Sequence, residues 1–159
     1  MNAELNHEAK KEIENTNEQS DINTIRVIFV QTGQHAVIRE IKETLEAMEE
    51  LVGGIPEEFM PFDDEVAIIC DAEAEARDLP MNRTVVDEES NVEDIVKGDF
   101  FIAYAPVDSP DYYSLPQKLE EKYLEMFYQP EMFFQVNDEI RSVKFDPDQG
   151  GATASGDQN

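Results

Sequence analysis

The chain has few of the residues that form cross-links, nucleophilic sites or metal centres. Of its 159 residues, one is cysteine, two are histidine and none is tryptophan. A single cysteine excludes an intramolecular disulfide, and Cys70 ends an apolar run typical of a buried strand, so we interpret it as a structural thiol. His7 lies in a polar stretch and His35 in a predicted turn, so neither is an obvious base for a catalytic cysteine.

Sequence motifs for common chemistries are also missing. The chain has no phosphate-binding loop, no zinc-type Cys/His spacing and no nucleophile elbow. The segment 146–151 resembles the start of a calcium loop, but it lacks the third acidic ligand and the final glutamate. We therefore predict a protein that is not an enzyme and has no cofactor and no metal site.

Long hydrophobic runs are absent as well. No apolar stretch approaches the roughly 20 residues of a membrane-spanning helix. The N-terminal residues lack the basic and apolar regions of a signal peptide. We expect a cytoplasmic protein with no membrane contact.

Basic residues are scarce, and acidic ones dominate. The chain has 37 Asp and Glu against 12 Lys and Arg, a net charge of −25. Residues 23–127 alone carry 25 acidic and eight basic residues, net −17, so the charge belongs to the predicted folded part and not only to the ends. Such a charge disfavours direct nucleic-acid binding and favours a basic protein partner.

The composition divides the chain into three parts. Residues 1–22 are polar and predict a disordered acidic arm, and residues 136–159 predict a mostly disordered tail. Residues 23–135 carry the apolar periodicity of one folded domain. The sequence does not predict an oligomeric state.

The order of predicted elements favours an α+β fold. Apolar, β-branched runs predict strands over residues 24–30, 36–41, 58–62, 66–70 and 99–105. Helical periodicity predicts one helix capped by Thr44 and a second that begins at Ser114 with a capping box. Residues 72–84 predict a helical turn or a loop, residues 87–91 an acidic loop, and residues 131–145 a short helix or an edge strand. Because strands and helices do not alternate regularly, we predict a single small domain with a mixed or antiparallel sheet of about four to five strands and one or two helices packed on one face.

Three groups of residues are candidates for binding. Two acidic runs could contact a basic partner, although charge runs of this kind are commonly only solvated surface. The segment 79–83 offers amide and guanidinium donors that could contact an anion or a peptide. Alternatively, it forms a structural turn in which the arginine pairs with neighbouring acids. Two adjacent tyrosines could form an interface, or cover the core. These candidates are Asp63, Asp64, Glu65, Asp87, Glu88, Glu89, Asn82, Arg83, Tyr112 and Tyr113.

The succession of motifs resembles a known family. The runs that carry the likeness are Ile25-Arg-Val-Ile-Phe-Val30, residues 43–54, 64–70, 79–83 and 95–102, and Ser114-Leu-Pro followed by residues 122–127. Over about residues 24–127 the chain is similar to the domain of unknown function 3846. This resemblance implies a protein of phages, prophages or other mobile elements and implies no catalytic residue.

Charge and resemblance together lead to two expectations about function. The first is an accessory protein that acts by binding, as an acidic DNA mimic that inhibits a nucleic-acid-binding host defence protein. The alternatives are a protein that binds or sequesters a small nucleotide-type signal, and a protein–protein adaptor.

Overall fold

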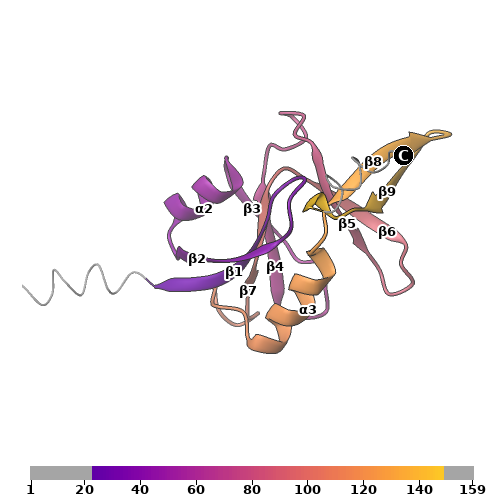
Figure 1. Cartoon of the computed structure of the whole chain (residues 1–159). Coiled ribbons are helices and arrows are strands. Elements are labelled where there is room, and N and C mark those ends of the chain that lie inside the picture. Colours follow the sequence, from indigo (N-terminus) through magenta and orange to yellow (C-terminus); the bar gives the residue numbers. More distant parts are fainter. Residues whose placement is uncertain (1–22, 149–159) are drawn as a thin grey trace, which may run out of the picture.

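A five-stranded antiparallel sheet forms the centre of the computed structural model, which describes residues 23–148 (Figure 1). The strand order is β2-β1-β7-β4-β3, and every neighbouring pair is antiparallel. The strands are β1 (Thr24–Val30), β2 (Val37–Lys42), β3 (Pro56–Phe59), β4 (Val66–Asp71) and β7 (Phe100–Tyr104). The predicted α+β class is confirmed.

The three inner strands are apolar on both sides because both faces of the sheet are covered. Along β7, Phe100 and Ile102 belong to one core cluster while Phe101 and Ala103 belong to the other. All four side chains are fully buried. Continuous apolar runs such as that of β4 are typical of strands enclosed in this way.

The helices lie on opposite faces of the sheet, whereas the sequence led us to expect them on one face. Helix α2 (Leu45–Val52) packs through Val52 against one core cluster. Helix α3 (Gln117–Phe127) packs through Tyr123 and Phe127 against the other. Figure 1 shows the two helices on either side of the sheet. Each helix shows the periodicity of a half-buried helix, but this periodicity does not specify which face of the sheet it covers.

The start of α2 was predicted correctly and that of α3 was not. Thr44 caps α2, its hydroxyl accepting a hydrogen bond from the Ala47 amide at 3.1 Å. Helix α3 begins after Pro116 without a side-chain cap. The Ser114 hydroxyl instead accepts from the backbone amide of Arg26 in β1, at 2.9 Å, so it joins this loop to the sheet.

Two hairpins complete the described part of the chain. The first joins β5 (Met81–Val86) to β6 (Val92–Lys97), where we expected a helical turn and a loop. Its Val85 is buried in the same core cluster as α3. The second joins β8 (Glu131–Val136) to β9 (Glu139–Lys144), in a segment for which the sequence predicted a short helix or an edge strand.

The second hairpin corrects the predicted domain boundary. Strand β9 and the residues up to Asp148 belong to the described structure, so the prediction of a mostly disordered tail from residue 136 is wrong for residues 136–148. The predicted arm over residues 1–22 and the rest of the predicted tail lie outside the described residues.

Candidate functional site

The two acidic runs predicted as binding residues border the same depression. Residues 63–64 lie in the link between β3 and β4, and residues 87–89 lie in the turn between β5 and β6. The depression has a volume of about 560 Å³. Six of its lining residues are acidic and one is basic, so its net charge is −5 when all are ionised. The charged lining residues are Asp63, Asp64, Asp87, Glu88, Glu89, Glu93 and Lys122.

Aromatic and apolar side chains also line this acidic depression. Phe62 and Tyr123 both contribute, with ring centroids 4.9 Å apart, and Met126 lies one helical turn further along α3. Tyr123 is fully buried as a residue, so α3 fixes the position of its ring. A cation that enters the depression therefore meets carboxylates together with the partly exposed ring of Phe62.

One ammonium group of the chain already occupies such a position. The Lys122 Nζ lies 2.7 Å from Asp64 Oδ2 and 5.2 Å from the centroid of the Tyr123 ring. The Tyr123 hydroxyl donates to the same carboxylate oxygen at 2.8 Å. The hydrogen bond from Lys122, followed by that from Tyr123, lowers the pKa of Asp64 below its usual 3.8. The depression thus has the chemistry to hold a cationic side chain.

Removal of this lysine should be visible in the titration of Asp64. The folded state holds the pKa of Asp64 below 3.8. Ionised Asp64 therefore stabilises the fold above pH 3.8, and this stabilisation is lost as the pH falls through the pKa of Asp64 in the folded protein. We expect Lys122→Met to raise the pKa of Asp64 toward 3.8, measured by carboxyl NMR. Lys118→Met, an exposed change on the same helix, is the control and should leave this pKa unchanged. An unshifted Asp64 in the Lys122 variant would show that the contact does not persist in solution.

Two of the predicted acidic residues have structural roles. The Glu65 carboxylate does not line the depression and accepts a hydrogen bond from the Val107 amide at 3.0 Å. The Asp87 carboxylate lines it but also accepts from the amides of Glu89 and Asn91, at 2.9 and 2.8 Å. Asp87 therefore shapes the turn that carries its acidic neighbours.

Asn82 and Arg83 are buried in β5 and are not accessible to an anion or a peptide. Both residues have zero exposure. The Arg83 guanidinium donates to the carbonyl oxygens of Phe127 and Gln34, at 3.0 and 2.6 Å, and to the Asn82 side chain at 2.8 Å. Asn82 in turn donates to the carbonyl of Val30 at 3.0 Å. Both residues therefore have a structural role, as in the alternative to an anion or peptide contact. That alternative was a turn in which the arginine pairs with neighbouring acids, whereas the segment is a strand and its donors pair mainly with backbone carbonyls.

Burial also changes the acidity of this arginine. It lowers the pKa of Arg83 to about 10, and the charge of Glu131 partly opposes this shift. Arg83 remains charged at neutral pH, because 10 is well above 7. It is a cation held inside the fold by hydrogen bonds to two other segments, at Phe127 and Gln34, and to its neighbour Asn82.

The two tyrosines lie away from the acidic depression. Tyr112 packs against the core cluster on the α2 face, and its hydroxyl donates to Glu58 Oε1 at 2.5 Å. Burial and this hydrogen bond raise the pKa of Tyr112. Tyr113 is 41% exposed and forms a β-bridge with Tyr104. Tyr112 therefore covers the core on the α2 face, which was the alternative to forming an interface.

Sequence reasoning missed Glu131, a buried carboxylate that joins the two hairpins. It accepts from the Thr84 hydroxyl in β5 and from the Ser142 hydroxyl in β9, both at 2.9 Å. The run Met-Phe-Phe in β8 is apolar and was compatible with an edge strand, but it did not indicate the burial of this charge.

The cysteine has the properties of an unreactive thiol. Cys70 lies on the α3 side of β4, partly buried. Burial, with a smaller effect from Glu57, raises the pKa of its thiol to about 11. The thiol is therefore protonated at neutral pH.

Comparison with known proteins gives the family. The antiparallel sheet and its two helices define a small α+β domain. Residues 25–128 match the model of the family described as Domain of unknown function (DUF3846), and the chain belongs to it. No curated protein and no solved structure matches the chain significantly. No helix among residues 23–148 has the length and apolar character needed to span a membrane.

Proposed function

We propose that this protein acts without catalysis, by binding a basic partner protein through the acidic depression. The observation that carries the proposal is the convergence of residues 63–64 and 87–89, from two separate links of the chain, on one depression. The partner class we favour is a nucleic-acid-binding host defence protein. The acidic domain, with the depression at the contact, would bind the basic surface of that protein where nucleic-acid phosphates otherwise bind. The protein would then serve a phage or another mobile element.

The electrostatics support a basic partner. Lys and Arg side chains of a partner would bring positive charge to the six clustered carboxylates. The ring of Phe62 would add a cation–π contact with these side chains. The Lys122 contact with Asp64 and Tyr123 is an example of this pairing within the chain itself. The same field opposes direct contact with DNA or RNA, and we expect no such binding.

A nucleotide-type ligand is less compatible with the arginines. A phosphate needs cationic donors, but each arginine of residues 23–148 already contacts its own chain. The contacts are Arg26 with Glu120, Arg39 with the Phe29 ring, Arg77 with Asp71, Arg83 with backbone carbonyls, and Arg141 with Glu139. We therefore do not favour the small-molecule alternative.

Affinity capture from host lysate tests the proposal. The tagged full chain is incubated with lysate at about 0.1 M and 0.5 M salt, where the Debye length falls from about 10 Å to about 4 Å. We expect salt-sensitive capture of a nucleic-acid-binding protein. The variant D63N/E88Q/E89Q should capture less of it, because all three residues are exposed in the depression.

A matched variant separates the depression from the overall charge. E46Q/E49Q/E50Q removes three exposed charges from α2, and we expect it to capture as well as the wild type. Equal losses in both variants would mean that the net charge and not the depression attracts the partner. Capture that is insensitive to salt and to both variants would contradict the proposal.

A further inference from the structure

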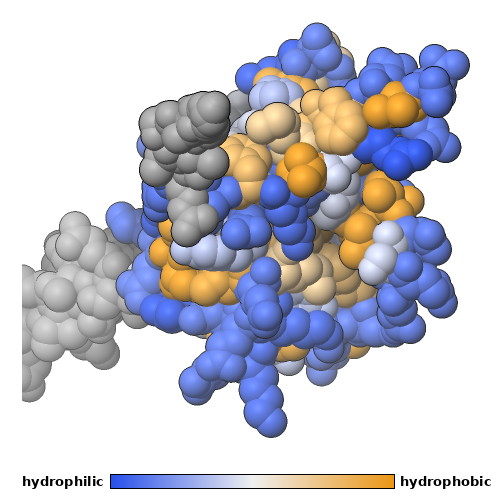
Figure 2. Space-filling view, turned by 45° about the vertical axis from the view of Figure 1, so that its right-hand side comes forward, coloured by the Kyte–Doolittle hydropathy of each residue, from blue (hydrophilic) through white to orange (hydrophobic). Residues whose placement is uncertain are grey.

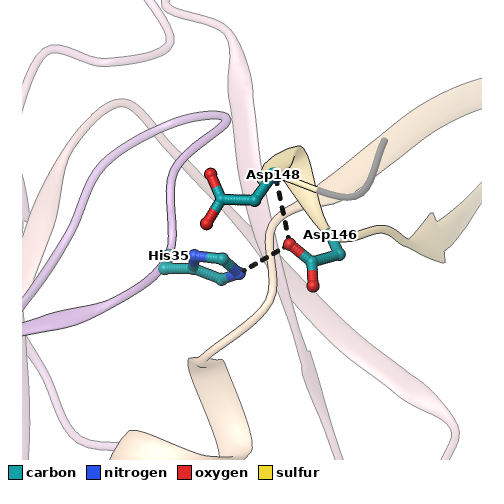
Figure 3. Close-up of side chains that lie close together, drawn as sticks. All are labelled: His35, Asp146 and Asp148. Carbon is teal, nitrogen blue, oxygen red and sulfur yellow. Dashed lines mark hydrogen bonds and ion pairs between the residues drawn. The ribbon is translucent and has the colours of Figure 1, made fainter. Parts of the chain in front are cut away.

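We propose that His35, Asp146 and Asp148 form a binding site for one divalent transition-metal ion such as zinc. One imidazole nitrogen and one carboxylate oxygen from each aspartate lie within 4.8 Å of one another. Figure 3 shows the three side chains converging from the turn between β1 and β2 and from the segment after β9. This site is separate from the acidic depression and does not depend on the proposed function.

The imidazole is held in place for such a role. The His35 ring stacks on Tyr128, with centroids 4.4 Å apart and planes inclined by 12°. The adjacent residue, Ala36, donates its backbone amide to the Tyr128 carbonyl at 2.9 Å. The stacked ring therefore has little freedom to turn away from the two aspartates.

The Nε2 atom of this imidazole has no hydrogen-bond partner. His35 Nε2 is buried and forms no hydrogen bond. Asp146 Oδ1 lies 3.3 Å from it, within ion-pair distance but without hydrogen-bond geometry. The same oxygen accepts a hydrogen bond from the Asp148 amide at 3.0 Å, which holds the two aspartates together (Figure 3). Buried polar atoms normally have a partner, and a metal ion would provide one for His35 Nε2.

The observed spacing suits a bound metal ion. Zinc binds histidine nitrogen and carboxylate oxygen at about 2.0–2.1 Å, so two tetrahedral ligands lie about 3.4 Å apart. The 3.3 Å between Nε2 and Asp146 Oδ1 agrees with this value. Asp148 is exposed, and a rotation of its side chain can bring its oxygen into the same sphere.

The ligand types select the class of ion. Imidazole favours zinc and other transition metals, whereas calcium and magnesium prefer oxygen ligands alone. Sequence reasoning missed the site because it considered the aspartates only as part of a calcium loop. The third ligand, His35, lies more than a hundred residues earlier in the sequence and reaches the aspartates only through the fold. The ion would connect the β1–β2 turn to the segment that follows the second hairpin.

Zinc titration of the full-length chain, after removal of metal with EDTA, tests this site. We expect one equivalent to bind and to raise the melting temperature by about 5–10 °C at hundredfold excess over its Kd. The chain has two histidines, so imidazole ¹H–¹⁵N spectra report on each. Zinc should shift the signals of one, and His35→Phe, which keeps a ring against Tyr128, should remove those signals and the thermal shift.

Two aspartate variants complete the test. Asp148→Asn should weaken zinc binding at least tenfold, whereas Asp108→Asn, the same change in an exposed loop, should not. The proposal is overturned if zinc does not bind, if His35→Phe binds it as well as the wild type, or if calcium gives the same response. Each of these results would leave the proposed function of the depression untouched.

Discussion

We expect Arg83→Ala to lower the free energy of unfolding by about 4 kcal/mol, the largest effect of any single polar substitution in this account. The change leaves the carbonyls of Phe127 and Gln34 and the side-chain oxygen of Asn82 without their donor. An unpaired buried polar group costs about 1–3 kcal/mol, and the cavity left by the side chain adds to this cost. Urea denaturation followed by circular dichroism measures the difference.

The reason for so large an effect is that Arg83 links three segments. Its guanidinium joins β5 to the end of α3 and to the turn between β1 and β2. Phe127 ends α3, so its carbonyl has no partner within the helix and depends on this donor. The planar fork of arginine suits several acceptors at once, and Arg83→Lys should therefore recover only part of the loss.

Arg141 provides the control for this experiment. It is exposed and pairs with Glu139 two residues away, so Arg141→Ala should change the free energy of unfolding by less than about 1 kcal/mol. A loss of less than 1 kcal/mol for Arg83→Ala would show that the buried hydrogen bonds are replaced by water. In that case, the structural role assigned to this residue would be wrong.

The second large effect concerns binding to a basic peptide. We expect D63N/E88Q/E89Q to reduce the affinity for a short lysine-rich peptide by about tenfold at about 0.1 M salt. Each exposed ion pair is worth about 0.5 kcal/mol, and three together correspond to about this factor. The substitutions spare Asp64 and Asp87, whose carboxylates hold Lys122 and the turn between β5 and β6. Isothermal titration calorimetry measures the change.

The control is again the triple variant of α2. E46Q/E49Q/E50Q should reduce the affinity less than twofold, because its charges lie on the opposite face of the sheet from α3. Raising the salt to about 0.5 M should remove most of the difference between the wild type and the depression variant. If the two triple variants bind equally, the peptide follows net charge and the depression has no special role.

The main sheet and both helices could be predicted from local patterns. Continuous apolar runs indicated β1, β4 and β7, and helical periodicity indicated α2 and α3. These patterns report how much of each element is buried. They do not report which face of the sheet a helix covers, and so the placement of the helices was wrong.

The two hairpins could not be predicted in the same way. In β5 the buried residues include Asn82 and Arg83, whose partners come from distant segments, so the strand has no alternation of apolar and polar residues. In the second hairpin the sequence does contain a turn signal, the pair Asn137-Asp138 between the two strands, but it was overlooked. Asn137 and Asp138 have positive φ angles of 51° and 71°, as in a two-residue turn between strands.

The acidic depression was predicted in its parts and not as a whole. The acidic residues at 63–64 and 87–89 were candidates from charge alone, but their proximity depends on how the β5–β6 hairpin packs beside α3. Lys122 and Tyr123 lie in a predicted helix and gave no signal of a site. A charge run shows where a chain is acidic, and only tertiary structure shows whether separate runs meet.

Displacement of duplex DNA tests the proposed mimicry most directly. A host DNA-binding protein obtained by salt-sensitive capture is bound to a fluorescent duplex, and the full chain is added at about 0.1 M salt while anisotropy is recorded. We predict that the wild type releases the DNA and that D63N/E88Q/E89Q needs about tenfold more protein to do so. DNA that stays bound while the acidic protein joins the complex would contradict the account.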